Sequence, residues 1–133
     1  MLPFKLQIIT PDGFLYDGDA ENVIVRTTVG DKGILARHEP YAAALGTGKI
    51  RVYFGGRFHV AALSSGLVKV GADKTLILAQ SCEWSENIDV KRAAIAKLAA
   101  EEKLNNPELS AKEHDIAEFK LKRALNRLDT AGK

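Results

Sequence analysis

Two pairs of charged residues near the C-terminus have the spacing of a binding site for a phosphorylated ligand. Asp89 begins an alanine-rich stretch, and Arg92 follows one helical turn later. A carboxylate at a helix start can cap free N–H groups or accept from a ribose or adenine donor. Arg123 and Arg127 are four residues apart, so a helix would put both forked guanidinium groups on one face, where they suit a polyphosphate. Ala93, next to Arg92, leaves room for a flat base.

The same residues have an ordinary structural interpretation. An aspartate at a helix start with an arginine three residues later is most often a cap with a surface ion pair. An arginine pair at this spacing is usually a solvated face that contributes a fraction of a kcal/mol. Spacing alone therefore leaves both interpretations open.

Two helices must position these residues. Residues 88–104 contain five alanines and no Gly or Pro, and residues 110–129 also avoid both. Between them, Asn105-Asn106-Pro107 breaks the helix because proline lacks the N–H donor. Ser110 and Glu113 have the capping-box spacing for the second helix. The sequence therefore predicts a helical hairpin.

Each predicted helix has a preferred packing side. At 100° per residue, the second helix separates an apolar stripe from a polar one. The apolar stripe comprises Ala117, Leu121, Ala124, Leu125 and Leu128, and the other stripe comprises Ile116, Lys120, Arg123 and Arg127. The first helix has few large apolar groups, and we expect its main anchors to be Ile88, Val90, Ile95 and Leu98.

The part before the helices has the punctuation of a β-domain. Ten of the eleven glycines lie at or before Gly71, and Gly55-Gly56 separates two alternating runs as a two-residue hairpin turn would. The strand-like runs are residues 4–10, 21–28, 49–54, 57–63, 66–70 and 75–80. We expect about eight short strands in an antiparallel sandwich or flattened barrel over residues 1–85, followed by the hairpin over residues 86–133.

Composition excludes several classes of protein. The 19 basic and 17 acidic residues are balanced along the chain, which gives no general argument for nucleic acid. Cys82 is the one cysteine and the three histidines are scattered, so no disulfide or metal-ligand cluster is expected. No run approaches the roughly 20 apolar residues of a membrane span, and no P-loop or catalytic triad can be assembled. We therefore expect no enzyme and no direct membrane insertion.

Three separated motifs resemble one family. They are the run from Gly30 to Pro40, the run from Ser65 to Val70, and the closing helical hairpin. Together they look like the epsilon subunit of F-type ATP synthase, in its bacterial, ATP-binding form, over essentially the whole chain. The resemblance implies a regulatory, non-catalytic subunit of the central stalk, in which the β-sandwich binds the gamma subunit and the rotor c-ring. It also implies that the hairpin extends towards the alpha and beta catalytic head subunits to restrain ATP hydrolysis.

The resemblance also implies a site for ATP as a regulatory ligand, and whether magnesium accompanies the nucleotide stays open. Family members that bind ATP carry I-D-x-x-R-A at the first helix and paired arginines in the second. The matching positions are Glu83, Ile88, Asp89, Arg92, Ala93, Arg123 and Arg127. Ala99 departs from members that carry a further basic residue there, which predicts a lower affinity. Asp31 and His38, in the Gly-rich run, are candidate rotor or stalk contacts, or else parts of an ordinary turn.

The family places such a subunit on the cytoplasmic face of the bacterial plasma membrane, held there by its partners. A rival interpretation is a small nucleic-acid-binding module, because residues 119–133 hold five basic groups against Asp129 alone. That interpretation predicts a steep salt dependence of oligonucleotide binding.

Overall fold

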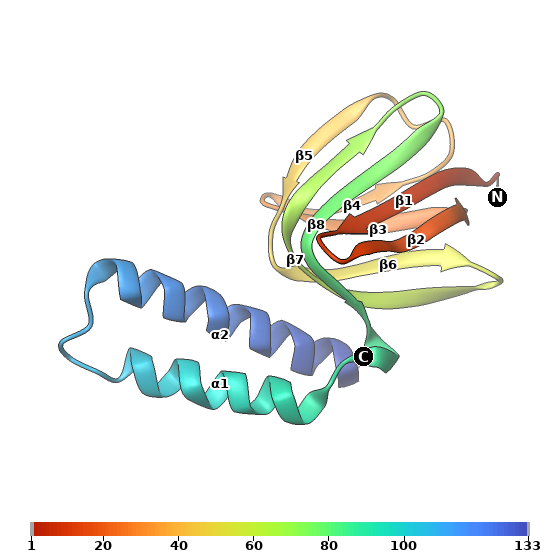
Figure 1. Cartoon of the computed structure of the whole chain (residues 1–133). Coiled ribbons are helices and arrows are strands. Elements are labelled where there is room, and N and C mark those ends of the chain that lie inside the picture. Colours follow the sequence, from red (N-terminus) through yellow and green to blue (C-terminus); the bar gives the residue numbers. More distant parts are fainter. Residues whose placement is uncertain (1, 133) are drawn as a thin grey trace. The chain divides into compact units, whose positions relative to one another are not determined.

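The structure is a computed structural model that describes residues 2–132. It forms two compact units, and the boundary in the chain lies between Trp84 and Ser85. We call the part up to Trp84 unit 1 and the part from Ser85 unit 2. Unit 1 is all β and unit 2 is a helical hairpin, as Figure 1 shows. The predicted fold class, a sandwich or flattened barrel followed by two helices, is confirmed.

Unit 1 contains eight strands, of which β1 is parallel to β8 and the other pairs are antiparallel. Their bounds are β1 (Phe4–Thr10), β2 (Gly13–Ala20), β3 (Asn22–Thr27), β4 (Gly30–Ile34), β5 (Tyr41–Leu45), β6 (Gly48–Phe54), β7 (Arg57–Val70) and β8 (Lys74–Trp84). β3 and β7 both pair with β5 and with β6, so the four strands form a closed circuit. This closure is the flattened barrel, and β8, β1 and β2 continue from β7 as an open edge.

The core of unit 1 is built from one face of each long strand. Strand residues alternate between faces, so apolar residues two apart share the interior. Leu6, Ile8, Val23, Val25, Ile50, Val52, Leu63, Val68 and Ile77 are all 0–1% exposed. Full burial of such side chains contributes about 1.5–3 kcal/mol each, which is the main stabilisation of this unit.

β7 is one strand of 14 residues, whereas the sequence predicted two separate runs ending at Leu63 and beginning at Gly66. The prediction failed because Ser65 and Gly66 form a bend inside a continuous strand. Ser65 has φ +55°, and β7 changes partner there, from β6 on one side of the bend to β5 on the other. A methyl group added at Gly66 would lie 2.1 Å from the carbonyl oxygen of Leu78, so only glycine fits.

Three strands, β2, β4 and β5, were not among the runs identified in the sequence. β4 corrects the expectation that Asp31 lies in a Gly-rich loop, because Gly30–Ile34 pairs with β3. The turn itself comes just before, where the Thr27 hydroxyl donates to the Gly30 carbonyl at 2.7 Å and Gly30 has φ +127°.

Unit 2 consists of a short 3-10 turn, η1 (Ser85–Asn87), and two helices, α1 (Val90–Leu104) and α2 (Ala111–Gly132). The Asp89 side chain caps α1 by accepting from the Arg92 N–H at 3.1 Å. Ser110 caps α2 by accepting from the Glu113 N–H at 3.2 Å and donating to its carboxylate at 2.9 Å. The predicted break and both caps are therefore present.

The helices pack through alanines, and this corrects the expected anchors of α1. Ala93, Ala100, Ala117 and Ala124 are 1–4% exposed, whereas Ile95, Leu98 and Val90 are 50–68% exposed. Small side chains let two helix backbones approach closely, so α1 turns its alanine face towards α2 and leaves its larger apolar groups outside. Ile88, just before α1, is buried as expected.

Candidate functional site

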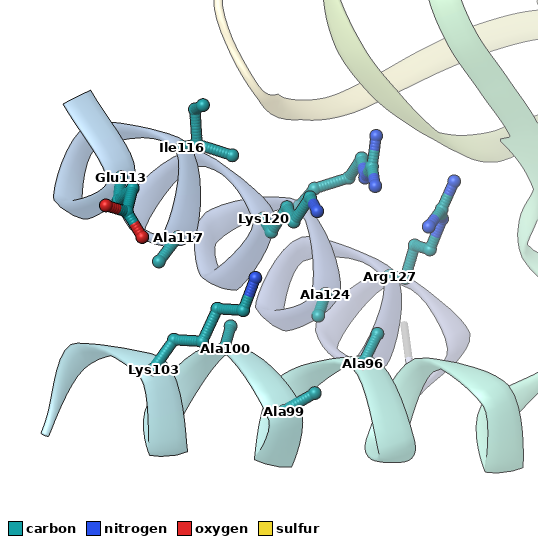
Figure 2. A pocket seen from close by; sticks show the side chains of 11 residues that line it. Ala96, Ala99, Ala100, Lys103, Glu113, Ile116, Ala117, Lys120, Ala124 and Arg127 are labelled. Carbon is teal, nitrogen blue, oxygen red and sulfur yellow. The ribbon is translucent and has the colours of Figure 1, made fainter. Parts of the chain in front are cut away.

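A pocket of about 400 Å³ lies between α1 and α2. We call it the hairpin pocket, and Figure 2 shows it from close by. Its lining residues are Ala96, Ala99, Ala100, Lys103, Glu113, Ile116, Ala117, Lys120, Arg123, Ala124 and Arg127. The volume falls within the range of roughly 300–1,000 Å³ that small-molecule sites occupy.

Helix periodicity explains why these residues meet. On α1, Ala96, Ala99 and Lys103 are spaced by three and four residues and so share one face. On α2, the polar stripe predicted from the sequence supplies Ile116, Lys120, Arg123 and Arg127, joined by Glu113 one turn earlier. Small alanines of α1 and long side chains of α2 both line the pocket (Figure 2).

The pocket is strongly cationic. Four of its lining residues are cationic, Lys103, Lys120, Arg123 and Arg127, and one lining residue, Glu113, is acidic. The Arg123 guanidinium lies 5.8 Å from the centre of the Phe119 ring, a cation–π contact that helps to fix it. Within residues 2–132, Lys103 and Lys120 have no acidic partner within 4.0 Å. The arrangement suits a ligand with several negative charges.

The structure brings together only part of the predicted site. Arg123 and Arg127 line the hairpin pocket. Arg92 does not line it but lies on the same face of α1, four residues before Ala96, and its side chain is exposed.

The other predicted ligand residues lie outside the pocket lining. Asp89 is exposed, and one of its carboxylate oxygens accepts the hydrogen bond that caps α1. Ala93 and Ile88 are buried, at 3% and 9% exposure. Glu83 belongs to β8 in unit 1. The predicted role of these four residues in binding stays a prediction.

Ala96, Ala100 and Lys103, on the α1 side of the pocket, were not among the predicted site residues. Arg92, Ala96, Ala99 and Lys103 follow the helical spacing i, i+4, i+7 and i+11, which is a visible signal once α1 is assigned. Lys103 is the functional candidate that this spacing would have found.

Unit 1 presents a second candidate surface, which we call the outer apolar row. Register pairing places Ala44, Leu67, Leu78, Ile9 and Phe14 side by side across five strands. They lie on the face opposite the core, because their neighbours Val68, Ile77 and Ile8 are buried. Leu67 is 55% exposed, Leu78 43% and Phe14 59%. The outer apolar row is therefore a candidate interaction surface.

Asp31 and His38, the predicted contact residues, lie on β4 and in the segment after it. The Asp31 carboxylate accepts from the Arg26 side chain at 2.6 Å, and this bond raises the pKa of Arg26. The His38 ring contacts the Glu39 carbonyl at 2.7 Å and the edge of the Tyr41 ring. Both are therefore held in place at the surface, and their role as contacts stays a prediction.

Two further groups have ordinary explanations. Cys82 is 7% exposed, and burial, with the charge of Glu83, raises the pKa of its thiol to about 12. Such a thiol is protonated and is no nucleophile at neutral pH.

His114, Asp115 and Glu118 form an exposed cluster on α2 in which His114 lies 3.4 Å from Glu118, as residues four apart on a helix commonly do.

Comparison with known proteins agrees with this architecture in both units. Residues 3–85 match the family model described as ATP synthase, Delta/Epsilon chain, beta-sandwich domain. Residues 86–132 match ATP synthase, Delta/Epsilon chain, long alpha-helix domain. The chain belongs to the ATP synthase delta/epsilon chain family. The boundary between the two family domains lies within one residue of the boundary between units 1 and 2.

Individual epsilon chains of this family match over the whole length. The ATP synthase epsilon chain of Bacillus pumilus is 46% identical over 100% of both chains. That of Ruminococcus albus is 43% identical over all of this chain and 99% of its own. These relatives are bacterial, which agrees with the resemblance seen in the motifs.

Solved structures give the same assignment. A chain in the Euglena gracilis mitochondrial ATP synthase, described as OSCP/F1/c-ring in rotational state 1, superposes with a TM-score of 0.82. It is 25% identical, and the match covers 98% of this chain and 82% of that one. A chain from the central stalk and c-ring of the Tetrahymena thermophila enzyme shares the fold, with a TM-score of 0.66 at 12% identity over 96% of both chains.

Over the described residues, neither helix is long and apolar enough to cross a membrane.

Proposed function

We propose that this chain is a non-catalytic subunit of the central stalk that couples the rotor to the catalytic head and restrains ATP hydrolysis. Unit 1 docks on the gamma subunit and the c-ring, and unit 2 acts on the alpha and beta subunits. The proposal is supported by the family and by structural neighbours from F1/c-ring and central-stalk assemblies. The complex would hold the chain at the cytoplasmic face of the bacterial membrane.

The outer apolar row supports the docking of unit 1. Its three largest members expose about half of their side chains, and full burial of a leucine or phenylalanine contributes roughly 1.5–3 kcal/mol. A row that crosses β5, β7, β8, β1 and β2 offers a flat, rigid surface to a partner helix. We expect the gamma subunit to cover it.

The hairpin pocket supports regulation by ATP, and it is the observation that carries this part of the proposal. It combines an alanine-lined volume, which could accept a flat base, with Arg123 and Arg127 from the opposite helix. A ligand that contacts both helices binds only the closed hairpin. ATP therefore stabilises that state by mass action, in proportion to its concentration.

The inhibitory state follows when ATP falls. The helices are then free to separate and extend, because the side chains that they bury are small: four alanines and Thr130 among the described residues. The basic residues of α2, Lys120, Lys122, Arg123 and Arg127, would then meet acidic loops of the catalytic subunits. Arg123 and Arg127 would bind ATP in the closed state and the catalytic subunits in the extended state. Bound ATP and inhibition would therefore exclude each other.

Isothermal titration of the isolated chain with ATP tests the sensor. We expect saturable binding in the millimolar range or tighter, weakened by Arg123→Ala and by Arg92→Ala. The matched control is Lys91→Ala, an exposed cation of α1 outside the pocket. Absence of binding, or variants that bind as the wild type does, would remove the sensor and leave the family assignment standing.

A further inference from the structure

The side chains that the hairpin buries are nearly all alanine, and Thr130 is the exception. α1 buries Ala93 and Ala100, and α2 buries Ala117, Ala124 and Thr130. Thr130 is 0% exposed, and its hydroxyl oxygen has no hydrogen-bond partner among residues 2–132. A threonine within a helix commonly donates its hydroxyl to the carbonyl four residues earlier, so a buried threonine without that bond is unusual.

Thr130 lies at the base of the hairpin, where the chain enters α1 and α2 ends. It is three residues after Arg127 and continues the polar stripe of α2 into the last turn, which ends at Gly132. α2 packs on η1, the turn before α1, and in Figure 1 the C-terminal end of α2 lies beside the beginning of α1. The closed hairpin therefore buries this hydroxyl at the end that joins the rest of the chain.

The other buried hydroxyl of unit 2 provides a contrast. Ser85 in η1 is 5% exposed, and its hydroxyl donates to the Glu86 carboxylate at 2.9 Å. That bond replaces one that the hydroxyl would make to water, so its burial costs little. The Thr130 hydroxyl loses its bonds to water without a replacement, and such a loss costs free energy.

This cost falls on the closed hairpin alone. When the helices separate, water reaches Thr130, and its hydroxyl regains the lost hydrogen bonds. The four buried alanines offer little apolar area to offset the cost, because the stabilisation from burial grows with the area removed from water. One hydroxyl therefore has a large effect on the balance between the closed and open hairpin.

We propose that the buried hydroxyl of Thr130 destabilises the closed hairpin and so determines how readily it opens. In this role Thr130 is a positioning residue, which acts on the two states of the helices and not on a ligand. The inference rests on the proposed opening of the hairpin, and it requires no nucleotide. A chain that lacks the hydroxyl should stay closed for longer and restrain ATP hydrolysis less.

Thr130→Val tests the proposal, because valine has the shape of threonine and a similar helix propensity but no hydroxyl. Opening is measured in the full chain without nucleotide, as the rate at which a thiol reagent modifies a cysteine introduced by Ala117→Cys. Ala117 is 1% exposed, so the reagent reaches this position only when the helices separate. We expect Thr130→Val to slow the modification about tenfold, the effect of removing one unsatisfied buried hydroxyl.

Three controls separate the hydroxyl from general changes in stability. Thr130→Ser keeps the hydroxyl and should not slow the modification at position 117. Ser64→Ala is the matched control, because the Ser64 hydroxyl is also buried without a partner but belongs to β7 of unit 1. It should leave the opening of the hairpin unchanged. Cys82, buried on β8, reports the opening of unit 1 in the same reaction, and its rate should not depend on Thr130.

The outcomes distinguish this role from the proposed opening itself. The Thr130 assignment is wrong, and the opening stands, if Thr130→Val leaves the modification at position 117 unchanged or makes it faster. An equal slowing in Thr130→Ser or in Ser64→Ala overturns the assignment as well. If the cysteine at position 117 reacts no faster than Cys82 in the chain that keeps Thr130, the hairpin does not open apart from unit 1. The proposed opening is then wrong, and the role of Thr130 falls with it.

Discussion

Leu67 on β7 and Leu78 on β8 are register partners whose side chains are both exposed, although their neighbours Val68 and Ile77 are buried in the core. The pair lies at the centre of the outer apolar row. Two exposed leucines add little to the core, and they are available to pack against a partner, which is the role proposed for the row.

Replacement of this pair should therefore weaken assembly and not folding. We expect Leu78→Asp to reduce co-purification with the gamma subunit by a factor of ten or more, because about 1.5–3 kcal/mol of apolar burial is lost and a charge is desolvated. The free energy of unfolding of the isolated chain, followed by the fluorescence of Trp84, should stay within about 0.5 kcal/mol of the wild type. Val29→Asp is the control, since Val29 is 94% exposed and lies outside the row. Equal losses in the two variants would contradict the assignment.

Gly66→Ala should destabilise unit 1. The added methyl group would meet the Leu78 carbonyl oxygen at 2.1 Å, so β7 and β8 must move apart at the bend. We expect a loss of about 1–3 kcal/mol or more, measured by urea unfolding. Gly33→Ala, where a methyl group meets nothing within 4 Å, should unfold like the wild type. An unchanged midpoint for Gly66→Ala would show that the strands adjust freely.

The two roles of Asp89 can be separated by substitution. Asp89→Asn keeps a side-chain oxygen for the Arg92 N–H, so helicity should be retained, whereas Asp89→Ala removes the cap and should cost about 1 kcal/mol. If the carboxylate also contacts the ribose or base, both variants should lose ATP affinity. A full affinity in Asp89→Asn would mean that the residue is a cap alone.

Cys82 should make stability depend on alkaline pH. Burial raises the pKa of its thiol in the folded chain from 9.0 to about 12, so the folded state retains a proton that the unfolded state releases. The contribution of the buried Cys82 thiol to the free energy of unfolding is complete below pH 9, and it is lost as the pH rises from 9 towards 12. We expect the difference in unfolding free energy between wild type and Cys82→Ala to shrink over that interval. At pH 8, a thiol reagent should modify Cys82 only after denaturant is added, and rapid modification of the folded chain would contradict its burial.

Local signals in the sequence were sufficient for the helical hairpin and for most strands. Pro107, the Ser110 cap and the change of hydrophobic period act within a few residues, so they survive in any tertiary context. β4 and β5 carry glycine and alanine where a strand usually has branched residues, and they become strands because β3 and β7 supply their hydrogen bonds. The residues of β4 and β5 alone do not reveal these partner strands, although β4 pairs with the strand just before it.

The site was predictable in part for the same reason. Arg123 and Arg127 share a face by helix geometry alone, and they line the pocket. The face of α1 that lines the pocket depends on which side of α1 packs against α2. The sequence offers two such sides, one with alanines and one with larger apolar residues. Ile95 and Leu98 have the larger apolar area, but the alanine stripe allows the closer helix approach and lies inside. Lys103 could be recognised only after that choice was known.

The bend in β7 also determines how unit 1 comes apart. β7 is hydrogen-bonded to β6, β5 and β8, so this one strand joins the closed circuit to β8, β1 and β2. Loss of the strand opens the closed circuit everywhere at once. Unit 1 should therefore unfold in a single all-or-none transition, with the slowest-exchanging amides along β7.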